Sequence, residues 1–97
     1  MANKERGYVE IELGGRNMTL RYTLNSLAEI EDKMGVALSE MSKVTMGMKT
    51  VRTLLWAGLI HEGLTEIEVG DMVDFDNMEY VQKQIAQSFE SATGKNS

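Results

Sequence analysis

A single histidine and a run of carboxylates are the residues of this sequence whose chemistry could support a metal site or acid–base catalysis. His61 precedes Glu62, as in the helices of zinc proteases, but Thr65 stands where such a helix needs its second histidine. With one histidine and no cysteine, the chain lacks the ligands of a typical zinc site. We interpret His61 as a structural or surface residue near a helix C-terminus, where a partial positive charge is favourable.

The carboxylates are clustered at Asp71, Asp74, Asp76 and Glu79. Calcium loops place acidic side chains at alternating positions before a glycine, and here apolar residues interrupt that order. Acid–base catalysis needs a pocket and a shifted pKa, and neither is visible in the sequence. No Gly-x-x-x-x-Gly-Lys phosphate loop is present. We therefore predict a protein that is not an enzyme, with no catalytic residue, metal site or cofactor.

The element that organises the fold is predicted to be a central helix over residues 48–62. Residues 54–60 carry no polar side chain, and Ala and Gly within them are poor strand formers. Apolar side chains at helical spacing form one face, Met48, Val51, Leu55 and Leu59. A second apolar strip is formed by Trp56 and Ile60, and a narrow polar stripe by Thr50, Thr53 and His61. Gly58 is expected to mark the close approach of another helix.

Before this helix, two segments of alternating apolar and polar residues flank a glycine pair, which is typical of a β-hairpin. Residues 14–17 are expected to form its turn. Glu10 and Glu12 of the first strand are expected to face arginines of the second strand, Arg16 and Arg21. Since a two-stranded ribbon is marginal by itself, it should pack on the helices or pair with another subunit through its free edges.

A helix with Leu24, Leu27, Ile30 and Met34 on one face is expected to follow the hairpin, capped by Thr23 or Asn25 and ended by Gly35. The linker Val36–Lys43 is expected to send Leu38 and Met41 into the core.

Two later helix starts share one pattern. Thr65 with Glu68 forms a capping box, and Asp76 with Glu79 is expected to form another. The accompanying hydrophobic staples are Leu64 with Val69 and Phe75 with Tyr80. The helices are predicted over residues 66–73 and 77–91, the latter with an apolar face of Met78, Val81, Ile85 and Phe89.

The fold class is thus α+β and mainly α, an N-terminal β-hairpin followed by about four helices around the central one. The 97 residues predict one domain over 8–90, between a flexible N-terminus at 1–7 and a flexible polar tail at 91–97. No apolar run approaches the roughly 20 residues of a membrane span. The sequence has no cysteine, so disulfides are excluded. We expect a cytoplasmic protein without a membrane partner.

Charge and methionine content bear on partners. The net charge is −5, and residues 62–79 hold seven acidic residues without Lys or Arg, which disfavours nucleic-acid binding. This acidic segment is either a solvated face or a surface for a basic partner. The eight methionines either fill the core or form a pliable groove for a partner helix.

Two segments carry a family resemblance: Leu-x-x-Ile-Glu-x-x-x-Gly over residues 27–35 and Leu-Trp-Ala-Gly-Leu over residues 55–59. With the hairpin and the acidic Leu64-Thr65 helix start, the chain resembles the small tail assembly chaperones of long-tailed phages, including the tail protein of gene transfer agents. The resemblance covers roughly residues 15–89, and both segments consist mostly of structural residues.

The resemblance implies a non-catalytic protein of the bacterial host cytoplasm. Such a protein binds the long, helical tape-measure protein and assists assembly of tail-tube subunits around it. Some members of the family carry a tail-tube label instead, so a structural tube or completion protein that self-assembles through the hairpin edge is the alternative. The candidate partner-binding residues are Met46, Met48, Trp56 and Ile60. A small enzyme or metal protein is the remaining rival.

Overall fold

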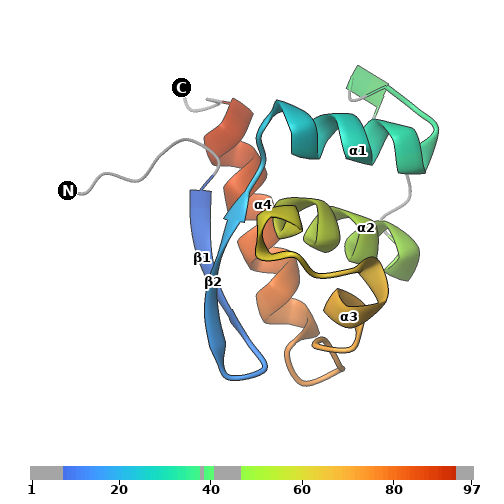
Figure 1. Ribbon diagram of the computed structural model, residues 1–97. Helices are drawn as coiled ribbons and strands as arrows, with labels where there is room; N and C mark the ends of the chain where they lie inside the picture. Colours follow the sequence, from blue (N-terminus) through green and yellow to red (C-terminus); the bar gives the residue numbers. More distant parts are fainter. Residues whose placement is uncertain (1–7, 38, 41–46, 94–97) are drawn as a thin grey trace.

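The computed structural model describes residues 8–37, 39–40 and 47–93, with side chains described as far as Phe89. Its elements are β1 (Tyr8–Leu13), β2 (Arg16–Arg21), α1 (Leu24–Met34), α2 (Met48–Gly58), the 3₁₀ turn η2 (Ile60–Glu62), α3 (Glu66–Gly70) and α4 (Met78–Thr93). The predicted class, a hairpin followed by four helices, is confirmed (Figure 1). Leu38, Met41 and Met46 lie outside the described residues.

The hairpin turns over two glycines. Gly14 and Gly15 have φ of +58° and +78°, the left-handed values that a two-residue turn of type I′ requires and that side chains resist. Leu13 pairs with Arg16 directly across the turn. The expected turn over residues 14–17 was therefore too long, because its last two residues belong to β2.

The predicted charge pairing across the hairpin is wrong. In the observed register Glu10 lies opposite Thr19 and Glu12 lies opposite Asn17. Arg16 instead bonds to the Glu62 carboxylate at 3.3 Å. Arg21 lies over the Tyr8 ring, 5.3 Å from its centroid.

Side chains of α4 occupy part of the outer edge of β1. The Tyr80 hydroxyl accepts a hydrogen bond of 2.9 Å from the Glu12 N–H, and the Gln84 amide donates one of 2.7 Å to the Glu10 carbonyl. A further strand could pair there only by displacing these side chains. The expectation of free edges is thus wrong for β1, and pairing of subunits through this edge loses its structural basis.

Helix α1 begins and ends as its sequence predicts. The Thr23 hydroxyl accepts a hydrogen bond from the Ser26 N–H, and Gly35 ends the helix with a φ of +74° while its N–H bonds to the Glu31 carbonyl. Ile30 is buried and Met34 is partly buried. Leu24, expected on the inner face, is 81% exposed, whereas Ser26 in the same turn is buried.

Helix α2 is central, in contact with β2, α1, α3 and α4 (Figure 1). It ends at Gly58 rather than at residue 62, since the chain tightens into η2 after Leu59. The predicted polar stripe is not a solvent-facing one: Thr50 and Thr53 are buried, and the Thr53 hydroxyl donates to Glu66 at 2.9 Å.

Gly58 marks a close approach, but to a strand. A Cβ atom there would lie 2.7 Å from Cδ2 of Leu20 and 2.9 Å from the Tyr22 ring. The Tyr22 hydroxyl donates to the Leu54 carbonyl, and its ring stacks on Phe89 with centroids 4.6 Å apart. The absence of a side chain at Gly58 therefore lets α2 and β2 pack directly on each other.

The two predicted capping boxes have different outcomes. Thr65 and Glu68 exchange both bonds of the box, at 2.8 and 3.1 Å, and Val69 of the staple is buried. Before α4, however, the carboxylate that accepts from the backbone amides is that of Asp74, not Asp76. Phe75 is 98% exposed, so the second staple does not form.

The core lies between the hairpin and the helices. It contains Ile11, Leu13, Met18, Leu20, Tyr22, Ile30, Val51, Leu54, Leu55, Ala57, Leu59, Val69, Val81 and Ile85. The predicted inner face of α4 is confirmed, with Val81 and Ile85 buried and Met78 and Phe89 partly buried. Helix α3 stops at Gly70, three residues early, and α4 continues to Thr93, two residues beyond its expected end.

Candidate functional site

Of the predicted partner-binding residues, the three that the structure describes lie in different surroundings, and Met46 lies outside the described residues. Met48 begins α2 and faces the α4 side, where it is 57% exposed. Trp56 is partly buried beneath Lys33 of α1, whose Nζ lies 4.9 Å from the ring centroid. Ile60 is partly buried in η2, beside a hollow that Arg21 also lines. Of these three described candidates, Met48 is the one at an open apolar surface.

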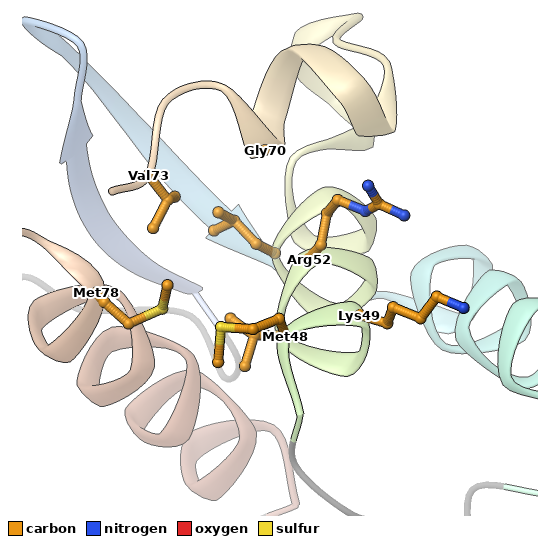
Figure 2. A pocket seen from close by; sticks show the side chains of 8 residues that line it. Met48, Lys49, Arg52, Gly70, Val73 and Met78 are labelled. Atoms are coloured by element: carbon orange, nitrogen blue, oxygen red, sulfur yellow. The ribbon is translucent and has the colours of Figure 1, made fainter. Parts of the chain in front are cut away.

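An apolar hollow of about 210 Å³ lies beside Met48. It is lined by Met48, Lys49, Val51, Arg52, Leu55, Gly70, Val73 and Met78. Met48 from α2 and Met78 from α4 point toward one another across it, and Val73 closes one side (Figure 2). The thioether chains are flexible, so the hollow can adapt to side chains of different shape. We take this hollow as the candidate binding site.

Lys49 and Arg52 line the hollow mostly with the aliphatic parts of their side chains. The Arg52 chain passes Gly70, where a Cβ would lie 3.1 Å from its Cδ, and its guanidinium is 3.6 Å from the Glu66 carboxylate. Lys49 is exposed and extends toward the α1 side (Figure 2). The hollow is thus apolar inside with two cations at one rim.

The loop of residues 71–77 adjoins the hollow at both ends, through Gly70 and Met78. Asp74 accepts from the amides of Asp76 and Asn77, and the Asn77 side chain bonds to the Asp74 N–H and the Met72 carbonyl, at 2.8 to 3.3 Å. These bonds fix the loop in a shape that presents Phe75 to solvent.

A polar cluster at Glu66 joins α1, α2 and α3. Lys33 lies 3.4 Å from the Glu66 carboxylate and Arg52 lies 3.6 Å from it. Burial raises the pKa of Glu66, but hydrogen bonds from Thr53 and Lys33 and the charges of Lys33 and Arg52 lower it more, so the net pKa is below its usual value. Because every member has a partner, we interpret this cluster as structural.

His61 is a surface residue of η2. Partial burial lowers the pKa of His61, and the charge of Arg21 lowers it further. The Glu62 carboxylate and a hydrogen bond to the Thr19 backbone offset only part of this effect. The net pKa of His61 is therefore below its usual value, which favours the neutral form at pH 7, and its Nε2 lies 3.5 Å from the Glu62 carboxylate.

The acidic residues from Glu62 to Glu79 are divided among separate roles. Glu62 and Glu66 form ion pairs, Glu68 completes a capping box, and Asp74 holds the loop. Within residues 8–37, 39–40 and 47–93, no group of three or more His, Cys, Asp and Glu side chains is arranged to hold a metal ion. Nor does that part of the chain contain a helix long and apolar enough to cross a membrane.

Comparison with known proteins supports a role in a phage tail. The model of a family described as "phage tail tube protein, GTA-gp10" matches residues 6–93. The chain belongs to this phage tail family. No curated protein and no solved structure gives a significant match. Membership of this tail family confirms the resemblance, and it makes other phage tail proteins the expected partners.

Sequence reasoning missed two features of the site. Phe75 was assigned to a staple, and its exposure depends on whether Asp74 or Asp76 binds the amides before α4. Met78 was treated as a residue of the inner face of α4, and its meeting with Met48 depends on the packing of α4 against α2. The sequence shows aspartates at positions 74 and 76, and either could accept hydrogen bonds from the backbone amides before α4. The sequence alone did not indicate which of the two does so.

Proposed function

We propose that this member of the phage tail family is a non-catalytic tail assembly chaperone that binds the tape-measure protein in the cytoplasm of the host and assists tube assembly around it. Its partners are the tape-measure protein and the tail tube protein. The observation that carries the proposal is the apolar hollow between α2 and α4, with Met48 half exposed at its mouth.

A hollow between two helices suits a helical partner, because apolar residues at positions i, i+3 and i+4 of an amphipathic helix lie on one face and fit such grooves. Two methionines opposite each other suit a long partner that presents different residues along its length. A tape-measure protein, expected to be long, helical and rich in apolar residues, has that property.

The hollow alone is too small for stable binding. Burying one large apolar side chain contributes about 1.5–3 kcal/mol, whereas micromolar affinity requires about 8 kcal/mol. The contact must therefore extend over neighbouring exposed residues. Ile67 of α3 is 69% exposed, and the last residue of that helix lines the hollow.

A structural tail component is the second candidate, favoured by the description of the matching family as tail tube proteins. Self-assembly through β1 would need the edge groups of Glu10 and Glu12 that α4 already binds. These contacts count against self-assembly through the β1 edge.

The test is a pull-down of the tagged protein from cells producing the phage, with recovered proteins identified by mass. We expect a long tape-measure protein with the wild type and a strong loss with Met48→Glu, which places a charge at the hollow. Leu24→Glu is the control, because Leu24 is an exposed apolar residue at the start of α1 and does not line the hollow.

Purified particles decide between the two candidates. Absence of the protein from particles, together with recovery of the tape-measure protein, supports the chaperone. Stoichiometric retention in particles supports the tube component. Equal recovery of the tape-measure protein by wild type and Met48→Glu would contradict binding at the hollow.

A further inference from the structure

The acidic loop of residues 71–77 projects an aromatic side chain that packs on nothing. Phe75 is 98% exposed, while hydrogen bonds from Asp74 and Asn77 fix the backbone on both sides of it. Exposure of a large apolar side chain to water is unfavourable. Because the loop backbone is already held in place, binding would have to order only the side chain. These are the properties of an interface anchor.

The hollow beside this loop has the size and chemistry to receive such a ring. An apolar cavity of about 150 Å³ is large enough to bind benzene, and the hollow offers about 210 Å³ between Met48, Val73 and Met78. Methionine sulfur also makes favourable contacts with aromatic rings. Phe75 does not enter the hollow of its own chain, since almost all of its surface is exposed.

The charges around the two features are opposite in sign. Phe75 is flanked by Asp74 and Asp76, whereas Lys49 and Arg52 lie at the rim of the hollow. With Arg52 already 3.6 Å from the Glu66 carboxylate, Lys49 is the rim cation that an aspartate of a docked loop would approach. Such rim pairs contribute to orientation and association rate more than to affinity.

We infer that the protein forms a symmetric dimer in which Phe75 of each copy inserts into the hollow of the other. The two features are neighbours, since the loop that carries Phe75 begins and ends beside lining residues of the hollow. A two-fold axis would bring each Phe75 to the hollow of the other copy, so both contacts form in one dimer and no further copy can be added through them. This interface is distinct from the hairpin edge. It uses the hollow in which the tape-measure protein is proposed to bind, so Phe75 of a second copy and the tape-measure protein would exclude one another there.

The test is sedimentation of the purified protein over a dilution series. The wild type should reach twice the 10.9 kDa mass of one chain. Phe75→Ala should raise the dimer dissociation constant by about tenfold or more, and it should not affect folding because the side chain makes no internal contact. Leu24→Ala, which also removes an exposed apolar side chain, should leave the constant unchanged.

Complementation sharpens the test. Phe75→Ala keeps its hollow and Met48→Glu keeps its Phe75, so each variant should dimerise more weakly than the wild type. Their mixture keeps one of the two contacts and should associate more strongly than either variant alone, and more weakly than the wild type. Lys49→Glu should weaken the dimer, and adding Asp76→Lys to it should restore the dimer.

A wild type that stays monomeric at its highest soluble concentration would overturn the inference and leave the hollow to another occupant. A dimer unaffected by Phe75→Ala would also overturn it, by placing the interface elsewhere. Either result is separable from the proposed function, because Phe75→Ala retains the hollow in which the tape-measure protein is proposed to bind.

Discussion

Gly58→Ala is a substitution for which helix propensity and tertiary packing predict opposite signs. Considered as a helix residue, alanine should stabilise α2 by about 1 kcal/mol relative to glycine. In the structure, however, the new Cβ would lie 2.7 Å from Cδ2 of Leu20 and 2.9 Å from both Cζ and Oη of Tyr22. Carbon atoms in favourable contact are about 3.5–4.0 Å apart, so the methyl group cannot be accommodated without movement.

The neighbours of Gly58 have little room to move. Leu20 is fully buried in the core, and Tyr22 is held by the Phe89 ring and by its hydrogen bond to the Leu54 carbonyl. Overpacking of a dense core costs about 1–3 kcal/mol, and three short contacts favour the upper end. After the gain in helix propensity we expect a net loss of about 2 kcal/mol in the free energy of unfolding. For a domain of this size, each kcal/mol lowers Tm by about 4–8 °C.

Urea denaturation followed by the fluorescence of Trp56 measures this loss. Gly70→Ala is the matched control, since its Cβ would meet only the exposed side chain of Arg52, which can move, and we expect no destabilisation. In a double-mutant cycle, Leu20→Ala should cost less in the Gly58→Ala background than alone, with a coupling of at least about 0.5 kcal/mol. Unchanged or increased stability of Gly58→Ala, or strict additivity with Leu20→Ala, would refute the packing argument.

Three further predictions concern polar contacts. Thr65→Ala should lower the free energy of unfolding by about 0.5–2 kcal/mol by removing a cap, whereas Asp76→Ala should change it by less than about 0.5 kcal/mol; equal losses in urea denaturation would contradict the observed cap. Tyr80→Phe should cost about 0.5–1.5 kcal/mol and speed hydrogen exchange of the Glu12 amide, and unchanged protection there would rule out the edge contact. Glu66 has a pKa below its usual value in the folded state, so its stabilisation is present above the unfolded pKa and lost as pH falls through the folded one. The stability difference between wild type and Glu66→Gln should therefore shrink in acid, and a difference independent of pH would contradict this.

Local signals in the sequence were sufficient for most elements. The glycine pair, the Thr23 cap, Gly35 and the capping box at Thr65 each specify a conformation through groups within five residues. The apolar periodicity of α4 predicted which side chains would be buried. These features depend on backbone sterics and on short-range hydrogen bonds, so a single sequence contains the information that determines them.

Ambiguity appeared where two neighbouring residues offered the same chemistry. Asp74 and Asp76 can both accept hydrogen bonds from backbone amides, and the sequence pattern favoured Asp76. In the structure Asp74 accepts them, while Asn77 anchors the loop to the Met72 carbonyl. This difference matters for function, because Phe75 is exposed to solvent instead of packed in a staple with Tyr80.

The sequence by itself determined the class of fold, the likeness to phage tail proteins and the central place of the helix that begins at Met48. Tertiary structure alone decided that β2, not a helix, packs on Gly58, that α4 occupies the edge of β1, and that Met48 and Met78 share a hollow. Each of these facts joins residues at least 30 positions apart in the chain. Contacts at such separations depend on how whole elements pack together, and no local pattern of side chains specifies that packing.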